Sequence, residues 1–299
     1  MKISIWTNPS QTWADIVATI KHCEDTGWDG AYVSDHFMPS FGDDTGPVSE
    51  CVALMAAIAV STSRVRIGSI VFGNTYRHPA VLLNQVATVD HISGGRVLLG
   101  IGAGWQENEH AAYGIELPPL KARMDRFEEA VQIIKGLLAN DRFSFSGSHY
   151  TVTNAPVNPK RADMPILIGG GGEKRTMKIA ARYADEWNVW STPEVMRAKL
   201  EILQRHCDDV GRDRGEIKVS TQALLFMSED ESFLGNMRNS DMGRSAIVGT
   251  PKEVGDILGE YASIGVDDLL VPDFTLPPVG QQRWDLLDQF AEVAAPHRS

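Results

Sequence analysis

The chain has 299 residues, of which 43% are hydrophobic and 22% charged, a composition typical of a globular protein with a sizeable core. Acidic residues outnumber basic ones by 39 to 28, so the formal charge is -11, which repels phosphate backbones and anionic lipid surfaces. We therefore expect no nucleic-acid partner and no membrane partner.

The cysteines and the N-terminus indicate a cytoplasmic protein without a metal centre. Cys23, Cys51 and Cys207 are odd in number, lie far apart and form no CxxC pair, so neither a disulfide framework nor a zinc site is expected. The apolar run in MKISIWTNPS is too short for a signal peptide, and no stretch approaches the roughly 18 apolar residues of a membrane span.

Short β-type runs alternate with helical patterns throughout the chain. In the first half the expected strands are residues 3–6, 30–36, 65–73 and 96–104, and the expected helices are 12–26, 50–61 and 79–91. In the second half the expected strands are 165–170, 185–190, 217–227 and 267–272, and the expected helices are 173–183, 193–210, 251–264 and 281–294. Eight such units in a chain of this length predict an α/β protein with a closed (β/α)8 barrel as a single domain over residues 1–299, rather than a doubly wound open sheet.

Prolines and threonines mark where helices begin, and two segments interrupt the alternation. Thr192 and Thr250 are expected N-caps, because each precedes a proline at a first helical turn. Residues 139–164 are expected to form a β-hairpin, and residues 228–248 a mobile polar insertion.

The carboxyl ends of barrel strands hold the active site, so strand-end residues can be nominated directly. They are aromatic, small or glycine, and comprise Trp6, Asp35, His36, Phe72, Gly73, Asn74, Thr75, Gly104, Trp105, Gly169, Gly170, Gly171, Gly172 and Trp187. This set suits a flat aromatic ligand that needs backbone contact on one face. HExxH, GxSxG and GxxxxGK[ST] motifs are absent from the sequence, so zinc, α/β-hydrolase and P-loop chemistries are disfavoured.

Asp35 and His36 are the strongest candidates for catalytic residues. Histidine exchanges protons near neutral pH, and its position at a strand end directs it into the barrel mouth. The alternative is a histidine that binds loop backbone beside an aspartate that caps a turn. Similarly, Asn74 and Thr75 either bind a heterocycle edge or simply turn the chain.

The loop after residue 102 and the glycine tetrad after residue 168 have two interpretations each. Trp105, Glu107 and Asn108 face a ligand that approaches the backbone, or Glu107 is a solvated helix residue. The tetrad ends a strand and opens a helix, whose free N–H groups attract phosphate, or it is a bare turn.

These strand ends, in this order, resemble the bacterial luciferase-like superfamily, and within it the deazaflavin-dependent oxidoreductases. The matching stretches are AYVSDHF (31–37), GNTYRHPA (73–80), HISGGRVLLGIGAGWQENEHAAYGI (91–115), PILIGGGGEKRT (165–176), ARYADEWN (181–188) and VGTPKEVGDIL (248–258). The resemblance covers nearly the whole chain.

The resemblance implies a barrel that binds coenzyme F420, or alternatively FMN, at its mouth. A non-prolyl cis peptide is expected within Ile70 to Gly73, so Val71, Phe72 and Gly73 would support the ring, and the tetrad would take the cofactor phosphate. Asp35 and His36 would lie beside the ring, with His36 as proton donor or acceptor.

The substrate pocket is also implied by the resemblance. Trp6, Trp105 and Trp187 would wall it. Some sugar-phosphate dehydrogenases of this family carry a glutamate where Trp105 falls, which argues against a sugar phosphate as substrate, and Glu107 is a possible substitute for that acid.

The leading hypothesis is an F420-dependent oxidoreductase that moves a hydride to or from a small organic substrate. The alternative is an FMN-dependent monooxygenase supplied with reduced flavin by a partner reductase, and a third reading is a flavin-binding relative without turnover. Members of the superfamily are often dimers, so a homodimer is expected.

Overall fold

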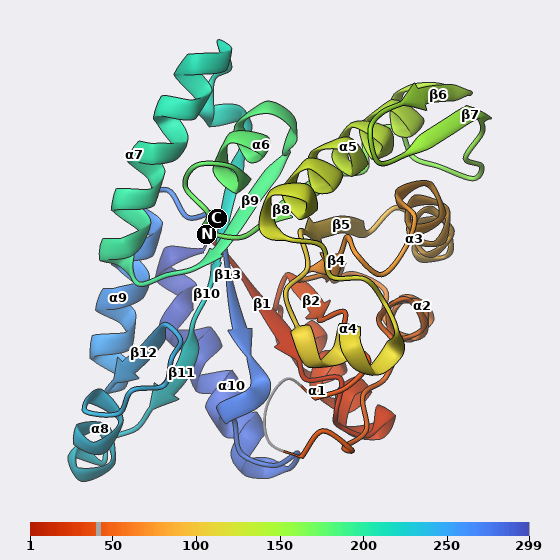
Figure 1. The fold of residues 1–299 in the computed structure, drawn as a ribbon. Coiled ribbons are helices and arrows are strands. Elements are labelled where there is room, and N and C mark those ends of the chain that lie inside the picture. The colour runs from red at the N-terminus through yellow and green to blue at the C-terminus, as the bar shows by residue number, and fades with distance from the viewer. Residues whose placement is uncertain (40–42, 299) are drawn as a thin grey trace.

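A ring of parallel strands forms the centre of the molecule (Figure 1). The computed structural model describes residues 1–39 and 43–298. Within these residues the main sheet consists of β1 (Lys2–Thr7), β2 (Gly30–Val33), β3 (Arg66–Ser69), β4 (Phe72–Gly73), β5 (Val97–Gly102), β8 (Ile166–Gly169), β9 (Glu186–Trp190), β10 (Lys218–Gln222) and β13 (Asp268–Pro272). The spatial order is β3-β2-β1-β13-β10-β9-β8-β5-β4, and all neighbours are parallel.

Pairing of β3 with β5 closes the sheet into a barrel. β3 and β4 are two parts of one strand, interrupted at Ile70 and Val71. Counted in this way, the described part of the chain contains eight barrel strands, so the predicted (β/α)8 fold is confirmed.

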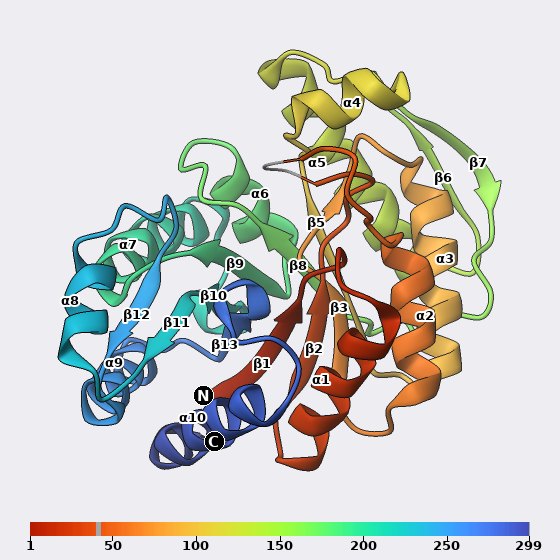
Figure 2. The same cartoon turned by 90° about the horizontal axis from the view of Figure 1, so that it is seen from below.

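Helices surround the barrel and lie between successive strands (Figure 1). They are α1 (Trp13–Asp25), α2 (Cys51–Ser61), α3 (Pro79–Ser93), α5 (Leu120–Ala139), α6 (Thr176–Tyr183), α7 (Pro193–Val210), α9 (Pro251–Ser263) and α10 (Gln281–Ala294). A further short helix, α4 (Glu107–Tyr113), lies beyond the carboxyl ends of β1 and β2 (Figure 2). The two termini are adjacent, since the Met1 ammonium group donates to the carbonyl of His297 at 2.8 Å.

Capping side chains fix where the helices begin. Thr192 accepts a hydrogen bond from the backbone N–H of Val195, and Thr250 forms a reciprocal capping box with Glu253. These contacts satisfy N–H groups that the first helical turn leaves unpaired, and they confirm both predicted N-caps.

Some segments differ from the predicted elements, and others add to them. Residues 217–227 are not one strand, because β10 ends at Gln222 and the chain then leaves the barrel as β11 (Leu224–Met227). Residues 228–248, the expected polar insertion, contain α8 (Glu231–Arg238) and the first part of β12 (Ala246–Gly249), which pairs with β11. The predicted hairpin is confirmed as β6 (Phe143–Ser146) and β7 (Thr151–Ala155), whereas α4 and α5 were not among the predicted elements.

The barrel interior is polar at the amino ends of the strands and apolar above them. Alternation along β1 sends Ile3 and Ile5 to the helices and Ser4 and Trp6 into the barrel. The lower layer is a buried ion cluster in which Arg66 contacts Glu186 at 2.8 Å and Asp268 at 2.9 Å. Above it lies a layer of apolar and aromatic side chains, Trp6, Tyr32, Ile70, Leu98, Leu167 and Leu270. These two layers fill the barrel, so a ligand has room only at the carboxyl ends of the strands.

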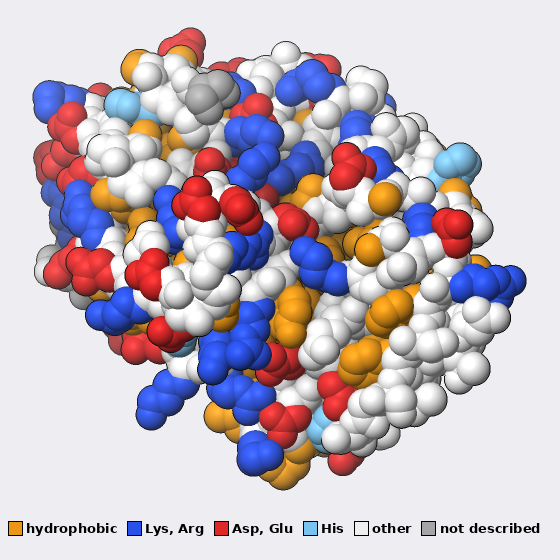
Figure 3. Space-filling view, turned by 90° about the horizontal axis from the view of Figure 1, so that it is seen from above, with side chains coloured by type: hydrophobic (Ala, Val, Ile, Leu, Met, Phe, Trp, Pro, Cys, Tyr) orange, Lys and Arg blue, Asp and Glu red, His pale blue; other side chains and the backbone are white. Residues whose placement is uncertain are grey.

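The outer surface mixes both signs of charge. The face in Figure 3 shows acidic and basic side chains interspersed, with hydrophobic side chains in small groups between them. Among the helices built from the described residues, none combines the length and apolar character that crossing a membrane requires.

Candidate functional site

A cavity of about 920 Å³ opens where the barrel strands end. Its volume lies in the range of small-molecule and cofactor sites. Residues from seven strand ends, from α5, and from the segments after β11 and β13 line it.

Most of the predicted site residues line this cavity. They are Trp6, Asp35, His36, Val71, Phe72, Gly73, Gly104, Trp105, Gly169, Gly170 and Gly171. The predicted residues that do not line it are Asn74, Thr75, Glu107, Asn108, Gly172 and Trp187. The convergence of residues around positions 35, 73, 104 and 170 at one end of the barrel agrees with the sequence analysis.

Trp187 supports the glycine loop from behind instead of walling the cavity. Its ring is fully buried, and its Nε1–H donates to the carbonyl of Gly170 at 3.0 Å. Alternation along β9 explains the difference, because residues 186, 188 and 190 point into the barrel and Trp187 points out to the helices. Trp190 is the tryptophan of this strand that lines the cavity.

The Asp35 side chain links the end of β2 to the end of β4. Its carboxylate accepts two hydrogen bonds from Arg77, at 2.7 and 2.9 Å, and one from the backbone N–H of Gly73 at 3.0 Å. Burial raises the pKa of Asp35, while the contacts with Arg77 and Gly73 oppose that rise. With its oxygens occupied in this way, Asp35 is better suited to positioning than to proton transfer.

His36 presents one ring nitrogen to the cavity. Its Nδ1 lies 3.2 Å from Glu109 Oε1, and its ring packs edge-on against Trp105 with the centroids 5.6 Å apart. No described residue hydrogen-bonds its Nε2. A histidine held by one nitrogen leaves the other free to exchange a proton with a bound molecule.

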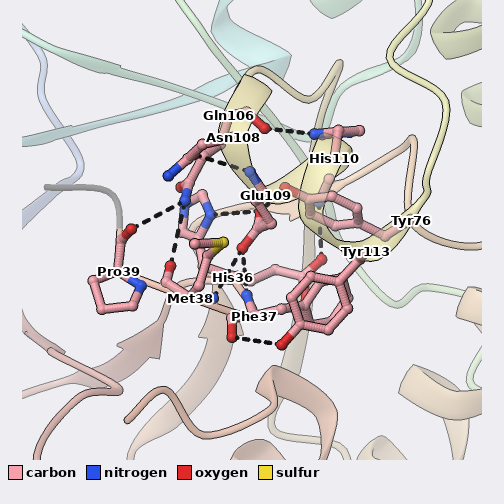
Figure 4. A network of polar contacts seen from close by, with 12 residues as sticks. His36, Phe37, Met38, Pro39, Tyr76, Gln106, Asn108, Glu109, His110 and Tyr113 are labelled. Carbon is pink, nitrogen blue, oxygen red and sulfur yellow. Dashed lines mark hydrogen bonds and ion pairs between the residues drawn. The ribbon is translucent and has the colours of Figure 1, made fainter. Parts of the chain in front are cut away.

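Glu109 organises this corner of the site, although the sequence analysis did not nominate it (Figure 4). Its side chain is fully buried and accepts hydrogen bonds from the Tyr76 hydroxyl and from the backbone N–H groups of Phe37 and Met38, besides its contact with His36. Burial alone would raise the pKa of Glu109, but the hydrogen bonds outweigh it and leave that pKa below its ordinary value.

Glu107 and Asn108 lie on the outer side of the same helix. Both side chains are exposed, so Glu107 is a solvated helix residue here, the alternative that the sequence left open. Asn108 instead accepts a hydrogen bond from the backbone N–H of Glu109 at 2.9 Å. The spacing of residues in the sequence does not show which of Glu107 and Glu109 faces the site. That depends on the direction in which α4 begins, which the sequence does not reveal.

Thr75 shapes the loop that carries Gly104. Its hydroxyl lies 2.7 Å from His110 Nε2, and a Cβ added to Gly104 would approach Thr75 Oγ1 to 2.5 Å. Glycine is therefore required where this loop crosses Thr75. Asn74 is 2% exposed and does not line the cavity, and neither atom of its amide has a hydrogen-bond partner among the described residues.

Val71 forms the floor of the cavity. The peptide bond between Ile70 and Val71 is cis, as expected for this segment. The Val71 side chain lies over three glycines: added Cβ atoms would approach it to 3.3 Å from Gly100, 2.8 Å from Gly102 and 2.7 Å from Gly169. The glycines thus admit Val71, and a flat molecule can lie on the apolar surface that it presents.

The glycine tetrad combines a tight turn with an open backbone. Gly170 has a φ of 126°, which other residues rarely adopt, and a Cβ on Gly171 would meet Val189 at 2.9 Å. Gly169, Gly170 and Gly171 line the cavity just before α6, whose N-terminus favours negative charge.

Two cations accompany the tetrad. Lys199 Nζ donates to the carbonyl of Gly171 at 3.0 Å and also pairs with Glu173 at 2.7 Å. Arg123 lines the cavity from α5, and its guanidinium forms no hydrogen bond or ion pair with any described residue. An unpaired arginine that lines the same cavity as a glycine-rich helix start is suited to binding an anion there.

In residues 1–39 and 43–298, no three His, Cys, Asp or Glu side chains gather as a metal site would require.

We predict that Glu109→Gln lowers the free energy of unfolding by about 2 kcal/mol at pH 7, because an amide cannot accept from all the donors around it. The pKa of Glu109 is lowered in the folded state, so its stabilisation is present above the ordinary carboxyl range and is lost as pH falls through the folded pKa. The difference between wild type and variant should therefore shrink below about pH 4. Urea denaturation at pH 7 and in the acid range measures it, and a difference of the same size at both would contradict this electrostatic account.

Comparisons with known proteins identify relatives of the chain. The family model described as luciferase-like monooxygenase matches residues 1–234. An F420-dependent glucose-6-phosphate dehydrogenase of Amycolatopsis mediterranei is 36% identical over 172 residues, which are 57% of this chain and 50% of that protein. A protein of the same name from Segniliparus rotundus is 32% identical over 228 residues, 75% of this chain and 66% of that protein. The chain thus matches about half to two thirds of the length of these curated relatives.

Solved structures share the fold over the full chain. An F420-dependent secondary alcohol dehydrogenase in complex with an F420-acetone adduct has a TM-score of 0.85 at 20% identity and covers 100% of this chain, with 99% of its own chain matched. The monooxygenase RslO1 from Streptomyces bottropensis has a TM-score of 0.81 at 19% identity, with 99% of each chain covered. At these identities the likeness concerns the fold alone.

Proposed function

The chain belongs to the luciferase-like monooxygenase family, and from that premise we propose that it is an F420-dependent oxidoreductase acting on a small organic substrate. The curated relatives that carry F420 in their names support the cofactor, as does the fit of the cavity to a flat ring with an anionic tail. The observation that carries the proposal is the meeting of the Val71 floor, His36 and the glycine tetrad in one cavity.

The residues present fit the cofactor at both of its ends. The apolar Val71 side chain and the glycine backbone around it suit one face of a planar ring. Gly170 and Gly171, with the unpaired Arg123, suit the phosphate. When bound, the deazaflavin accepts or supplies a hydride at its carbon 5.

His36 carries the proton in this proposal. Glu109 fixes its Nδ1 and so aims Nε2 at the substrate, and the edge-on ring of Trp105 limits its rotation. When an alcohol is oxidised, Nε2 takes the hydroxyl proton, and in the reverse direction His36 returns it to the carbonyl oxygen. Asp35 has a positioning role, because it holds Gly73 and Arg77 against the strand end from which His36 projects.

The expected homodimer, the cytoplasmic location, the single domain and the absence of nucleic-acid partners remain predictions from the sequence.

The direct test is spectroscopic. We expect purified protein to bind F420 and to change the F420 absorbance band when a series of small alcohols and ketones is added under nitrogen. Oxygen-dependent turnover of reduced FMN would instead favour the monooxygenase alternative, and binding of F420 without turnover of any substrate would favour a relative without activity.

We predict that His36→Ala lowers turnover about 100-fold or more while the F420 dissociation constant stays within about tenfold of wild type, since general acid–base groups contribute at least this much to rate. His149→Ala is the matched control, because His149 is exposed in the hairpin outside the cavity lining and should have no effect. Equal turnover in wild type and His36→Ala would remove His36 from the mechanism.

We predict that Gly170→Asp weakens F420 binding more than Gly170→Asn does, by about tenfold or more. The two side chains have nearly the same size and both strain the φ of 126°, so their difference isolates the negative charge placed beside the phosphate. Fluorescence titration with F420 gives both dissociation constants. Equal losses in the two variants would show that the phosphate binds elsewhere.

A further inference from the structure

One side of the cavity is an aromatic wall that the proposed cofactor contacts leave unused. It consists of Trp6, Trp190 and Phe274, with ring centroids 5.6 Å apart for Trp6 and Trp190 and 4.9 Å apart for Trp6 and Phe274. All three residues line the cavity. In the ring of eight strands, β1 lies opposite β8 and β10 lies opposite β3–β4, so Trp6 faces the glycine tetrad, and Gln222 at the end of β10 faces the Val71 floor, across the mouth. Trp190 ends β9, beside β8, and completes the wall on that side.

Gln222 is a buried polar residue beside this wall. It ends β10, where it is the register partner of Trp190 on β9, and it lines the cavity although it is 4% exposed. No hydrogen bond joins either end of its amide to another described residue. A buried amide without a partner costs free energy in the unliganded protein, which a bound molecule would relieve.

The charges near the wall do not suit a phosphorylated substrate. Among the described residues that line the cavity, Arg244 is the cation beside the wall; it is exposed, and its guanidinium lies 5.5 Å from the centroid of the Trp190 ring. Arg123 lines the cavity from α5, whose start lies beside the start of α6 through the ion pair of Asp125 with Arg175, and there the cofactor phosphate would occupy it. A dianionic phosphate desolvated against three aromatic rings would lack the paired cations that it needs.

We propose that Gln222 and this wall determine the substrate class, which is a neutral, largely apolar molecule carrying one hydroxyl group besides the group that reacts. An amide can donate to or accept from a hydroxyl, and the rings of Trp6 and Trp190 cover the apolar body. The assignment rests on the proposed function for the identity of the reacting end, and it excludes glucose 6-phosphate, the compound in the names of the curated relatives, as the preferred ligand.

The test uses two probes that differ at one position, cyclohexane-1,4-diol and 4-methylcyclohexanol, with glucose 6-phosphate as the anionic comparison. Ligand-observed NMR titrations of the protein, with and without F420, give dissociation constants independently of turnover. Because binding is read in both conditions, a protein that does not bind F420 would contradict the proposed function while the titrations still decide the role of Gln222.

We expect Gln222→Met to reduce the preference for the diol over its methyl analogue about tenfold, the effect of one lost hydrogen bond of roughly 1.4 kcal/mol. Gln85→Met is the matched control, because Gln85 Oε1 is also buried without a partner but lies outside the cavity lining. It should leave the preference unchanged.

Three results would overturn the proposal. They are an unaltered preference in Gln222→Met, an equal loss in Gln85→Met, and tighter binding of glucose 6-phosphate than of the diol by the wild-type protein.

Discussion

Closure of the barrel between β3 and β5 is the constraint on which the site depends. Gly100 on β5 lies so close to β3 that a Cβ there would approach the carbonyl oxygen of Ser69 to 2.0 Å, so no side chain fits at this position. Because all the barrel strands are parallel, closure brings every carboxyl end to one rim. Residues as distant in sequence as Trp6 and Phe274 therefore share one cavity, and the two filled layers below leave them as its floor and walls.

The chemistry at this rim relies on ionic groups that are already paired. Asp35 pairs with Arg77, and Glu109 accepts hydrogen bonds from the Tyr76 hydroxyl and from the backbone N–H groups of Phe37 and Met38. Breaking such a buried pair costs more than forming it gains, so these contacts fix geometry more than they add stability. Arg123 and Gln222, which line the cavity without a hydrogen-bond partner among the described residues, mark where the protein has polar capacity for a ligand.

Much of the fold and of the site could be predicted from the sequence, because strand ends in a parallel barrel are chemically distinctive. Asp35, His36 and the tetrad stand at such ends. Thr192 and Thr250 are N-caps that the following prolines make recognisable in the sequence. Two features that the sequence analysis missed do have a local signal in the sequence. Period-two alternation along β9 separates Trp187 from Trp190, and the helical spacing of Met124, Phe127, Val131 and Ile134 indicates α5.

Other features depend on tertiary packing and have no local signal. Glu109 differs from Glu107 only in the direction that α4 imposes, and Arg123 and Gln222 acquire significance from the partners that they lack. The departure of β11 from the barrel follows from its pairing with β12, a contact that no local pattern in residues 217–227 shows.

The most direct measurement is a crystal structure of the protein with F420. The account predicts the deazaflavin ring on Val71, its phosphate within hydrogen-bond distance of the backbone N–H groups at Gly170 to Thr176, and His36 Nε2 facing the reacting edge of the ring. A ring bound outside this cavity, or a phosphate held away from the glycine tetrad, would contradict it.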